Sequence, residues 1–459
     1  MAWSLLAACS SSGAENPGSD GAAASGGTTG SGGVSSSGGA PATGGASGSG
    51  GKQGTGGMTG SGGSVGTGGA SSGGTGTGGT ASGGRGTATG GSSTGGVGTG
   101  GTAGTPASGG LTGHGGQGVP GGAAGGGLAG AAGGGASGTP GPCDIFQAGN
   151  TPCVAAHSTV RALYASYSGN LYQVRRASDK TTKDIATTAP GGYAASSAQD
   201  SFCTGTTCTI SIIYDQSPNA NHLTKATPGG WLNNGGLEAN ATAARITLAG
   251  HTVYGVYTTS NFDNDVGAVG YRNNAAKNIP KGDEPESMYM VASGKHFNQY
   301  CCFDYGNAET NNKDDGAATM EAVYFGNSTQ WGRGSGTGPW VMADLEDGVF
   351  GGGSFAAPAT NTSLMASYVT VKLNGPSGNR FVLKGGDAQS GMLATKYDGA
   401  RPSGYSPMKK QGALILGVGG DNSHTGEGTF FEGCLTAGVP TDATDDAVQA
   451  NIVAAGYGR

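Results

Sequence analysis

The chain has 459 residues, of which 100 are glycine, and a formal net charge of −6 at pH 7. Only 11% of its residues are charged, so we expect no basic surface of the kind that binds nucleic acid. No apolar run approaches the length of a transmembrane helix.

The first nine residues end in Leu-Ala-Ala-Cys, with Cys9 followed by Ser10. This ending resembles the lipobox of bacterial lipoproteins, in which the cysteine becomes the lipidated N-terminus. However, no basic region precedes it, and the apolar run is short for a signal peptide. Two interpretations stay open: a truncated lipoprotein signal over residues 1–9 with a membrane anchor on Cys9, or an incidental cysteine.

Residues 10–140 form one tract of mainly Gly, Ser, Thr and Ala that contains no aromatic residue. Such a composition cannot bury enough apolar surface to offset the entropy of ordering the chain. Its irregular Thr-Gly-Gly and Ser-Gly-Gly repeats lack the strict third-position glycine of collagen. We therefore expect residues 10–140 to be a disordered linker that tethers a folded domain.

After residue 140 the composition changes, and residues 141–459 carry seven of the eight cysteines. This stretch is predicted to be one domain, either a single large β-sandwich or two lobes. Its first element is expected to be a helix over residues 152–167, because apolar residues from Val154 to Tyr167 recur near helical spacing and Gly169 follows.

Eight short segments rich in β-branched or aromatic residues follow, separated by Gly, Asn and Asp turns. This spacing predicts an all-β fold, a β-sandwich of jelly-roll or concanavalin-like type with short flanking helices. Asp and Thr in the first turn and Gly456 at the end predict a closing helix over residues 442–455. The expected strands are residues 209–214, 287–292, 321–325, 340–345, 366–373, 380–384, 413–418 and 429–435.

Six cysteines of the domain fall into close pairs, and Cys434 stands alone. Short loops closed by cysteines are typical of exported proteins in an oxidising compartment. A metal site is the competing interpretation, but the chain has no Cys-x-x-Cys pair and its histidines are scattered. Two adjacent cysteines are commonly free thiols or are bonded to other cysteines. Since the other four paired cysteines are expected to bond locally, a disulfide between the two adjacent cysteines is expected. The pairs are Cys143 with Cys153, Cys203 with Cys208, and Cys301 with Cys302.

Two segments place carboxylates in apolar surroundings. In residues 339–350, Asp344 and Glu346 would project from the same face of a strand. The alternative is a solvated strand end that runs into an Asp347-Gly348 turn. In residues 413–423, a buried strand breaks at a double glycine that leaves Asp421 at its mouth, although a plain turn fits this sequence too.

Motifs spread over residues 141–457 resemble the catalytic domain of α-L-arabinofuranosidase B, glycoside hydrolase family 54. They include Thr-Pro-Cys-Val-Ala-Ala-His-Ser-Thr at 151 and Leu-Tyr-Gln-Val-Arg-Arg at 171. Further on come Cys-Cys-Phe-Asp-Tyr-Gly-Asn-Ala-Glu-Thr-Asn at 301, Met-Glu-Ala-Val-Tyr-Phe-Gly at 320, Gly-Pro-Trp-Val-Met-Ala-Asp-Leu-Glu at 338 and Gly-Gly-Asp-Asn-Ser at 419.

The resemblance implies a β-sandwich and a retaining mechanism, with Glu346 as nucleophile and Asp421 as general acid and base. Such a mechanism needs two carboxyl groups about 5 to 5.5 Å apart. The sugar subsite implied by the family consists of the Cys301–Cys302 disulfide, Trp331, Asp344, Asp347, Gly348 and Gly420.

The chain departs from the family pattern in three places. Asp347 stands where family members usually have Asn, which adds a negative charge beside the nucleophile. Cys434 replaces an aliphatic residue, and we expect a buried free thiol there. The sequence ends at Arg459 without the arabinose-binding β-trefoil of the fungal enzymes, so weaker binding to polymers is expected.

We therefore expect an exo-acting α-L-arabinofuranosidase that releases terminal arabinofuranose from arabinan or arabinoxylan side chains. A carbohydrate-binding sandwich without catalysis is the alternative from another class, and a galactofuranosidase or xylosidase is the alternative within enzymes. The expected partners are arabinose-containing plant polysaccharides. We expect no cofactor and no metal ion, a monomer, and a secreted or cell-surface location.

Overall fold

The structure is a computed structural model that describes residues 138–262 and 267–459. The interpretations of residues 1–9, of Cys9 and of the tether up to residue 137 lie outside the described residues. None of the helices in the described ranges is long and apolar enough to cross a membrane.

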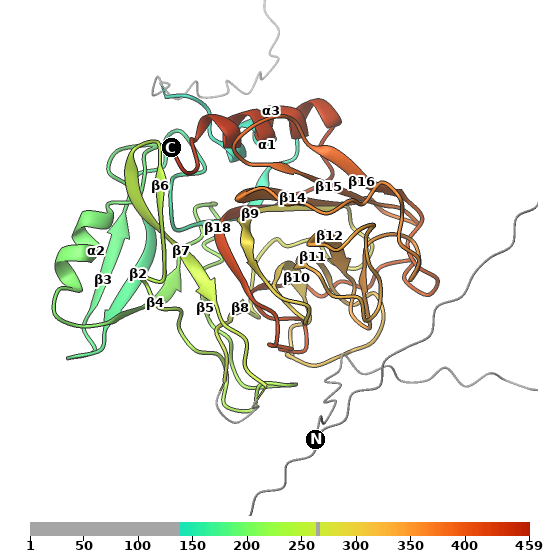
Figure 1. Ribbon diagram of the computed structural model, residues 1–459, viewed down its shortest axis with the longest axis horizontal. Coiled ribbons are helices and arrows are strands. Elements are labelled where there is room, and N and C mark those ends of the chain that lie inside the picture. The colour runs from blue at the N-terminus through green and yellow to red at the C-terminus, as the bar shows by residue number, and fades with distance from the viewer. Residues whose placement is uncertain (1–137, 263–266) are drawn as a thin grey trace, which may run out of the picture. The chain divides into compact units, whose positions relative to one another are not determined.

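Within these ranges the chain forms two antiparallel sheets that pack face to face, as the all-β prediction requires (Figure 1). One sheet has, in spatial order, β16 (Ala394–Gly399), β15 (Phe381–Asp387), β14 (Tyr368–Gly375), β9 (Glu286–Phe297), β18 (Gly428–Ala437), β7 (His251–Thr258) and β6 (Ala244–Leu248), with β1 (Cys153–Ser158) also paired to β18. The other has β13 (Val349–Phe350), β12 (Trp340–Asp344), β11 (Glu321–Gly326), β10 (Asp304–Ala308), β17 (Ala413–Leu416), β8 (Tyr271–Asn273), β5 (Leu223–Lys225), β4 (Cys208–Ile213), β2 (Asn170–Arg176) and β3 (Thr182–Ala186).

Three helices flank the sheets in the described residues: α1 (Pro142–Ala148), α2 (Ser196–Phe202) and α3 (Asp442–Ala454). Helices α1 and α3 pack together over the sheet that contains β14 and β18 (Figure 1). Thr441 caps α3 by accepting a hydrogen bond from the Thr444 amide, which stabilises the predicted closing helix.

The sheet that contains β12 is buried on both faces. Val323 and Val341 belong to the main core between the sheets, whereas Tyr324 and Met342 belong to a second apolar cluster. Since neighbouring residues of a strand point to opposite faces, this second cluster lies on the outer face of the sheet. Trp331, from the loop after β11, completes the cluster and shows that loops cover this face.

The eight predicted strands are confirmed, but the helix predicted over residues 152–167 is wrong. Its first half is strand β1, which pairs antiparallel with β18. Every residue of β1 is buried, so its sequence shows no alternation that would distinguish a strand from a helix. Tertiary pairing with β18 outweighs the helix propensity of the two alanines in β1.

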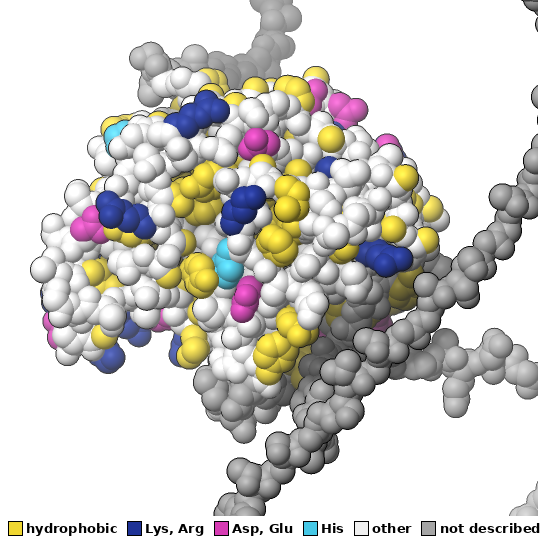
Figure 2. Space-filling model, viewed as in Figure 1, with side chains coloured by type: hydrophobic (Ala, Val, Ile, Leu, Met, Phe, Trp, Pro, Cys, Tyr) yellow, Lys and Arg dark blue, Asp and Glu magenta, His cyan; other side chains and the backbone are white. Residues whose placement is uncertain are grey.

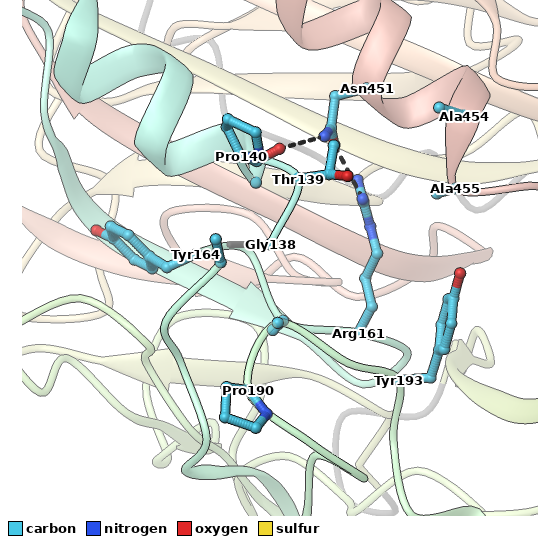
Figure 3. A pocket seen from close by; sticks show the side chains of 14 residues that line it. Gly138, Thr139, Pro140, Arg161, Tyr164, Pro190, Tyr193, Asn451, Ala454 and Ala455 are labelled. Atoms are coloured by element: carbon cyan, nitrogen blue, oxygen red, sulfur yellow. Dashed lines mark hydrogen bonds between the residues drawn. The ribbon is translucent and has the colours of Figure 1, made fainter. Parts of the chain in front are cut away.

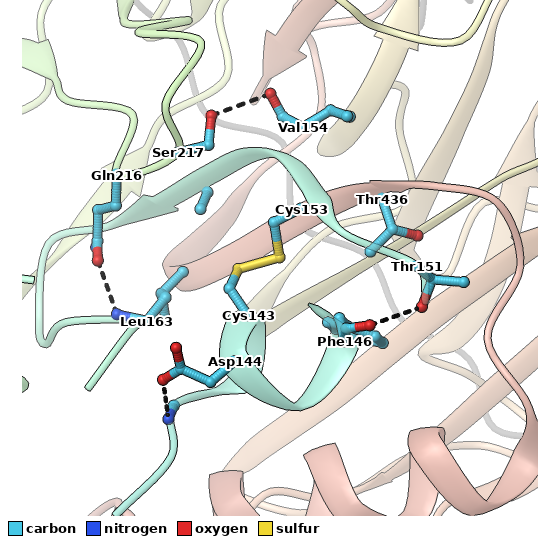
Figure 4. Close-up of a disulfide and its surroundings, with 12 residues drawn as sticks. Cys143, Asp144, Phe146, Thr151, Cys153, Val154, Leu163, Gln216, Ser217 and Thr436 are labelled. Atoms are coloured by element: carbon cyan, nitrogen blue, oxygen red, sulfur yellow. Dashed lines mark hydrogen bonds between the residues drawn. A yellow bond between two sulfur atoms is a disulfide. The ribbon is translucent and has the colours of Figure 1, made fainter. Parts of the chain in front are cut away.

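The disulfide between Cys143 and Cys153 joins α1 to β1 (Figure 4). The segment between the two cysteines, expected to be a turn-rich loop, contains α1 instead. Asp144 fixes the start of this helix, because its carboxylate accepts hydrogen bonds from the amides of Gly141 and Ala165. Disulfides also join Cys203 to Cys208 and Cys301 to Cys302, and Cys434 is a buried free thiol.

The Cys434 sulfur lies within 4.8 Å of both sulfurs of the Cys143–Cys153 disulfide. Burial raises the pKa of the thiol far above its ordinary value. We therefore expect Cys434 to be unreactive in the folded protein but to attack the disulfide once unfolding exposes it, because only the thiolate attacks.

Cys434→Val should remove this reaction and increase the fraction of protein that refolds after a thermal scan. A repeated calorimetric scan measures the recovered transition, and mass mapping of the heated wild type should find scrambled disulfides that the variant lacks. Rapid labelling of Cys434 in native protein would contradict the expectation.

Candidate active site

One cross-strand row runs over the outer face of the sheet from β12 to β8. The paired residues are Asp344, Ala322, Gly306, Ile415 and Arg272, from β12, β11, β10, β17 and β8. Residues paired across strands share a face, so an acid and a base stand at the two ends of this row. The small residues Ala322 and Gly306 lie between them and form a low floor over which loops can place side chains.

Glu346 reaches this face from a turn. Strand β12 ends at Asp344, and Glu346 and Asp347 both have positive φ, of 59° and 56°. The prediction that Glu346 continues the strand and alternates with Leu345 is therefore wrong. Two consecutive residues with positive φ are typical of the tight turn that joins β12 to β13. The Glu346 amide donates to Asp344 Oδ1 at 3.2 Å, which anchors the turn to the strand end.

Positive φ is unfavourable for a glutamate, by about 1–3 kcal/mol. The surrounding fold imposes it, since Leu345 donates to the Gly348 carbonyl and accepts from the Ala318 amide. Gly348 is required there, because a Cβ at this position would lie 2.5 Å from the Phe350 ring.

Asp421 is held by the loop after β17 and by a second loop that follows β5. Its Oδ1 accepts the Ser423 amide at 2.8 Å, and its carbonyl accepts the Trp231 amide at 3.0 Å. Gly230 lies against the same carbonyl and has positive φ, so only glycine fits. Glu346 Oε1 and Asp421 Oδ2 are both buried without a hydrogen-bond partner among the described residues. Each carboxyl group therefore keeps one oxygen free for chemistry.

Arg272 holds the loop that carries Asp421 and the segment that carries Glu309. Its Nη1 donates to the Gly420 carbonyl at 2.7 Å and to Asn422 Oδ1 at 3.0 Å, and its Nη2 donates to the Glu309 carbonyl. The guanidinium is buried, and burial lowers its pKa to about 10. It is still a cation at neutral pH and faces Glu309, Glu346 and Asp421.

The Cys301–Cys302 disulfide, Trp331 and Asp344 lie on the other side of Glu346. Asp344 Oδ2 is 3.1 Å from Cys302 Sγ and 3.6 Å from Cys301 Sγ. Since Asp344 Oδ1 accepts the Glu346 amide, this one carboxylate touches both the disulfide and the Glu346 turn. Trp331 and the disulfide share the apolar cluster on the outer face, which offers a sugar a rigid apolar wall.

Gly420 and Asp347 complete the set of residues named from the sequence. A side chain on Gly420 would overlap a carboxyl oxygen of Glu309 and would lie 2.6 Å from Glu346 Oε2. Asp347 is partly exposed, and burial together with Asp314 raises its pKa. The structure thus brings all nine residues named for catalysis and sugar binding to one region of the outer face.

The carboxyl groups of the site are protonated more easily than ordinary carboxylates. Burial raises the pKa of Asp344 to about 7 and that of Asp421 to about 6. Burial and the neighbouring Glu309 and Asp421 raise the pKa of Glu346 well above its ordinary value. Such crowding of buried carboxyl groups without matching cations is typical of catalytic sites.

Three residues of the site were missed from the sequence: Arg272, Glu309 and Asp304. Asp304 is fully buried beside Asp344, and both burial and Asp344 raise its pKa. Glu309 and Asp304 lie inside the Cys-Cys-Phe-Asp-Tyr-Gly-Asn-Ala-Glu motif, whose two acids at the ends of a largely apolar run were a usable signal. No sequence signal pointed to Arg272, because its role depends on the pairing of β8 with β17.

Other candidate sites carry less chemistry. A cavity of about 290 Å³ between residues 138–141 and α3 is lined by none of the candidate active-site residues (Figure 3). Its Arg161 is paired with Glu432 and Asn451, and Asn451 donates to the Pro140 carbonyl, so these polar groups are already used. Cys301, Cys302, Asp304 and Asp344 offer donor atoms within 4.8 Å of one another, but sulfurs joined in a disulfide are not thiolate ligands. On the face shown in Figure 2, the Lys and Arg side chains of the described residues are scattered.

Two buried carboxyl groups with unpartnered oxygens lie over one face of the β-sandwich, and glycoside hydrolases use such a pair. The family model described as "Alpha-L-arabinofuranosidase B, catalytic" matches residues 142–458. The chain therefore belongs to this family, glycoside hydrolase family 54.

Named relatives and solved structures agree with this assignment. A probable α-L-arabinofuranosidase B of Aspergillus fumigatus is 55% identical over 323 residues, which cover 69% of this chain and 62% of that protein. A Trichoderma koningii protein named arabinofuranosidase/B-xylosidase is 54% identical, with 69% and 63% covered. The chain thus spans less than two thirds of the length of these relatives.

Two solved structures resemble the chain with a TM-score of 0.66 and cover 69% of it. One is a family 54 α-L-arabinofuranosidase soaked with a cyclic sulfate inhibitor, which is 52% identical and 66% covered. The other is an arabinofuranosidase complexed with arabinofuranosyl-α-1,2-xylobiose, which is 51% identical and 65% covered.

Arg272→Lys should destabilise the protein and the site together. A lysine cannot reach two backbone carbonyls and Asn422 at once, so buried acceptors lose their donors. We expect a loss of about 3–5 kcal/mol in unfolding free energy, the range for a broken buried charge network. Urea denaturation measures it. Lys225→Arg, on the exposed end of β5, is the matched control and should leave the midpoint unchanged; an unchanged midpoint for Arg272→Lys would contradict the analysis.

The contribution of the site carboxyl groups to the stability of the folded protein should fall as the pH rises from about 4 to about 8. The site carboxyl groups have raised pKa values in the fold, so the folded state binds more protons than the unfolded chain within this window. At pH 7, Glu346→Gln should have a higher melting temperature than the wild type and a free energy of unfolding larger by an amount on the order of 1 kcal/mol. The stability of this variant should also depend less on pH. Calorimetry of both proteins at a series of pH values tests this; a pH dependence as steep in Glu346→Gln as in the wild type would contradict it.

Proposed function

We propose that the chain is a retaining exo-α-L-arabinofuranosidase that releases terminal arabinofuranose from arabinan or arabinoxylan side chains. The observation that supports it most is the pair Glu346 and Asp421, each buried with one unpartnered oxygen, beside the Cys301–Cys302 disulfide. A pure binding site needs neither free oxygen. The relatives' names and the complex of a similar structure with arabinofuranosyl-α-1,2-xylobiose point to the same sugar.

In the proposed mechanism Glu346 attacks the anomeric carbon of the arabinofuranoside while Asp421 gives its proton to the departing oxygen. The raised pKa of Asp421 suits this role, because an ordinary aspartate would hold no proton near neutral pH. The sugar is then bonded to the Glu346 oxygen. Asp421 next removes a proton from water, which attacks the same carbon and releases arabinose with its configuration retained.

The apolar wall and Asp344 orient the ring in this scheme. Trp331 and the disulfide contact the hydrophobic edge of the furanose, and Asp344 accepts hydrogen bonds from its hydroxyls. Asp347 and Gly348 approach the sugar from the turn, and Gly420 from the Asp421 loop. The acidic surroundings, which include Asp314, disfavour negatively charged sugars such as uronates.

Xylosidase activity is the second candidate, because one relative is named arabinofuranosidase/B-xylosidase. One set of chromogenic furanosides and pyranosides separates the sugars. We further propose that the protein is secreted or displayed on the cell surface, which its disulfides support.

The two carboxyl groups should respond differently to substitution. Glu346→Gln should lose nearly all turnover on every substrate, because the covalent bond cannot form. Asp421→Asn should lose about 10²- to 10⁴-fold on a natural oligosaccharide and far less in the first step on an activated aryl arabinofuranoside, whose leaving group needs no proton. Stopped-flow release of the aryl alcohol measures that step.

Azide should restore turnover to Asp421→Asn and give an arabinosyl azide of retained configuration. Asp315→Asn, which changes an exposed acid, is the matched control and should keep wild-type kinetics. Retained-configuration rescue of Glu346→Gln instead, or an inverted product from the wild type, would overturn the assignment of roles.

A further inference from the structure

A third carboxyl group, that of Glu309, lies beside Glu346 and has no part in the scheme above. Glu309 follows β10 and is fully buried. Its Oε1 accepts a hydrogen bond from the Thr319 hydroxyl at 2.5 Å. Its Oε2 is buried and has no hydrogen-bond partner among the described residues. A buried oxygen left without a partner is costly unless it carries or meets a proton.

Gly420 shows where that free oxygen points. A Cβ built on Gly420 would overlap Glu309 Oε2 and would lie 2.6 Å from Glu346 Oε2. The two carboxyl oxygens therefore meet over the same point of the Gly420 backbone. A rotation of either side chain that shortens their separation to 2.5–3.0 Å would form an O–H···O hydrogen bond.

Glu346 also needs a hydrogen-bond donor. It must be ionised to attack the sugar, yet Glu309, Asp421, Asp344 and Asp314 all surround it with carboxyl groups. The cation that faces these groups is Arg272, and the contacts of its guanidinium with the Glu309 and Gly420 carbonyls leave Glu346 without a direct ion pair in the described residues.

We infer that Glu309 is a positioning residue that keeps its proton and donates it in a hydrogen bond to Glu346 Oε2, so that Glu346 is ionised and correctly oriented when the sugar binds. The Thr319 hydroxyl lies 2.5 Å from Oε1 and 2.6 Å from the Gly316 carbonyl. In this scheme its single proton goes to Oε1, the carbonyl oxygen of the neutral acid, which leaves the Oε2 proton for Glu346. Arg272 from β8 and Asp344 from β12 are the charged groups that face Glu309 besides Glu346. Burial raises the pKa of Glu309 to about 8, in agreement with a neutral group at working pH. This inference rests on the proposed function.

The test compares Glu309→Gln and Glu309→Leu in the full chain. Glutamine can accept from Thr319 and donate an N–H to Glu346, whereas leucine can do neither. With 4-nitrophenyl α-L-arabinofuranoside, the acid limb of the kcat/KM pH profile reports the ionisation of Glu346. We expect this limb to stay in place in Glu309→Gln and to move up by about one to two pH units in Glu309→Leu, the effect of losing a hydrogen bond to a charged group. Asp315→Asn, in the loop between β10 and β11, should leave it unmoved.

Opposite results would overturn the inference. If Glu309 is ionised, both substitutions remove a negative charge next to Glu346 and move the acid limb to lower pH. If Glu309 only packs, Glu309→Leu melts at a lower temperature without moving the limb. Infrared difference spectra of wild type against Glu309→Gln at pH 7 give a readout without substrate, and they should contain the band of a protonated carboxyl group. If the protein hydrolyses no glycoside but its spectra contain this band, only the proposed function is overturned. If the band is absent, the inference is overturned.

Discussion

The buried guanidinium of Arg272 is the contact on which the site depends. It connects β8 to the carbonyls of Glu309 and Gly420, so one side chain fixes two segments that approach Glu346. It is also the cation around which several buried carboxyl groups gather. Without it the loops would have to find other donors for their carbonyls, and the carboxyl groups would face one another in a medium that screens their repulsion poorly.

Buried acids elsewhere in the described chain are treated differently. Glu432 forms a bidentate pair with Arg161, and Glu321 pairs with Arg401 and Lys410. Although burial alone would raise the pKa of Glu321, these two cations bring it below its ordinary value. The acids of the site lack such pairing, and Glu346 is also held at positive φ. Acids without a cation partner therefore gather at the site, where reactive carboxyl groups are useful and where the surrounding sandwich is large enough to hold them.

The sequence predicted the sandwich well because eight of its strands are short apolar runs bounded by turn residues. It failed at β1, whose burial on all sides removes the alternation that distinguishes a strand. For the site, family motifs located the nine residues that the fold brings together, but the physical reason given for Glu346 was wrong, since the strand ends two residues earlier. Arg272 could not be found from its neighbours in sequence, because its role comes from a cross-strand row assembled from five separate segments.

Gly306 and Ala322 carry almost no side chain where they lie between Asp344 and Ile415. The floor of the site between these residues is therefore peptide backbone, held by ladder hydrogen bonds at the fixed spacing of about 4.8 Å between strands. A wall made of side chains can yield by changing rotamers, but a backbone surface of this kind cannot move without breaking the sheet. Ring size would then be gauged against a rigid surface, and changes in substrate preference would have to arise in the loops above it.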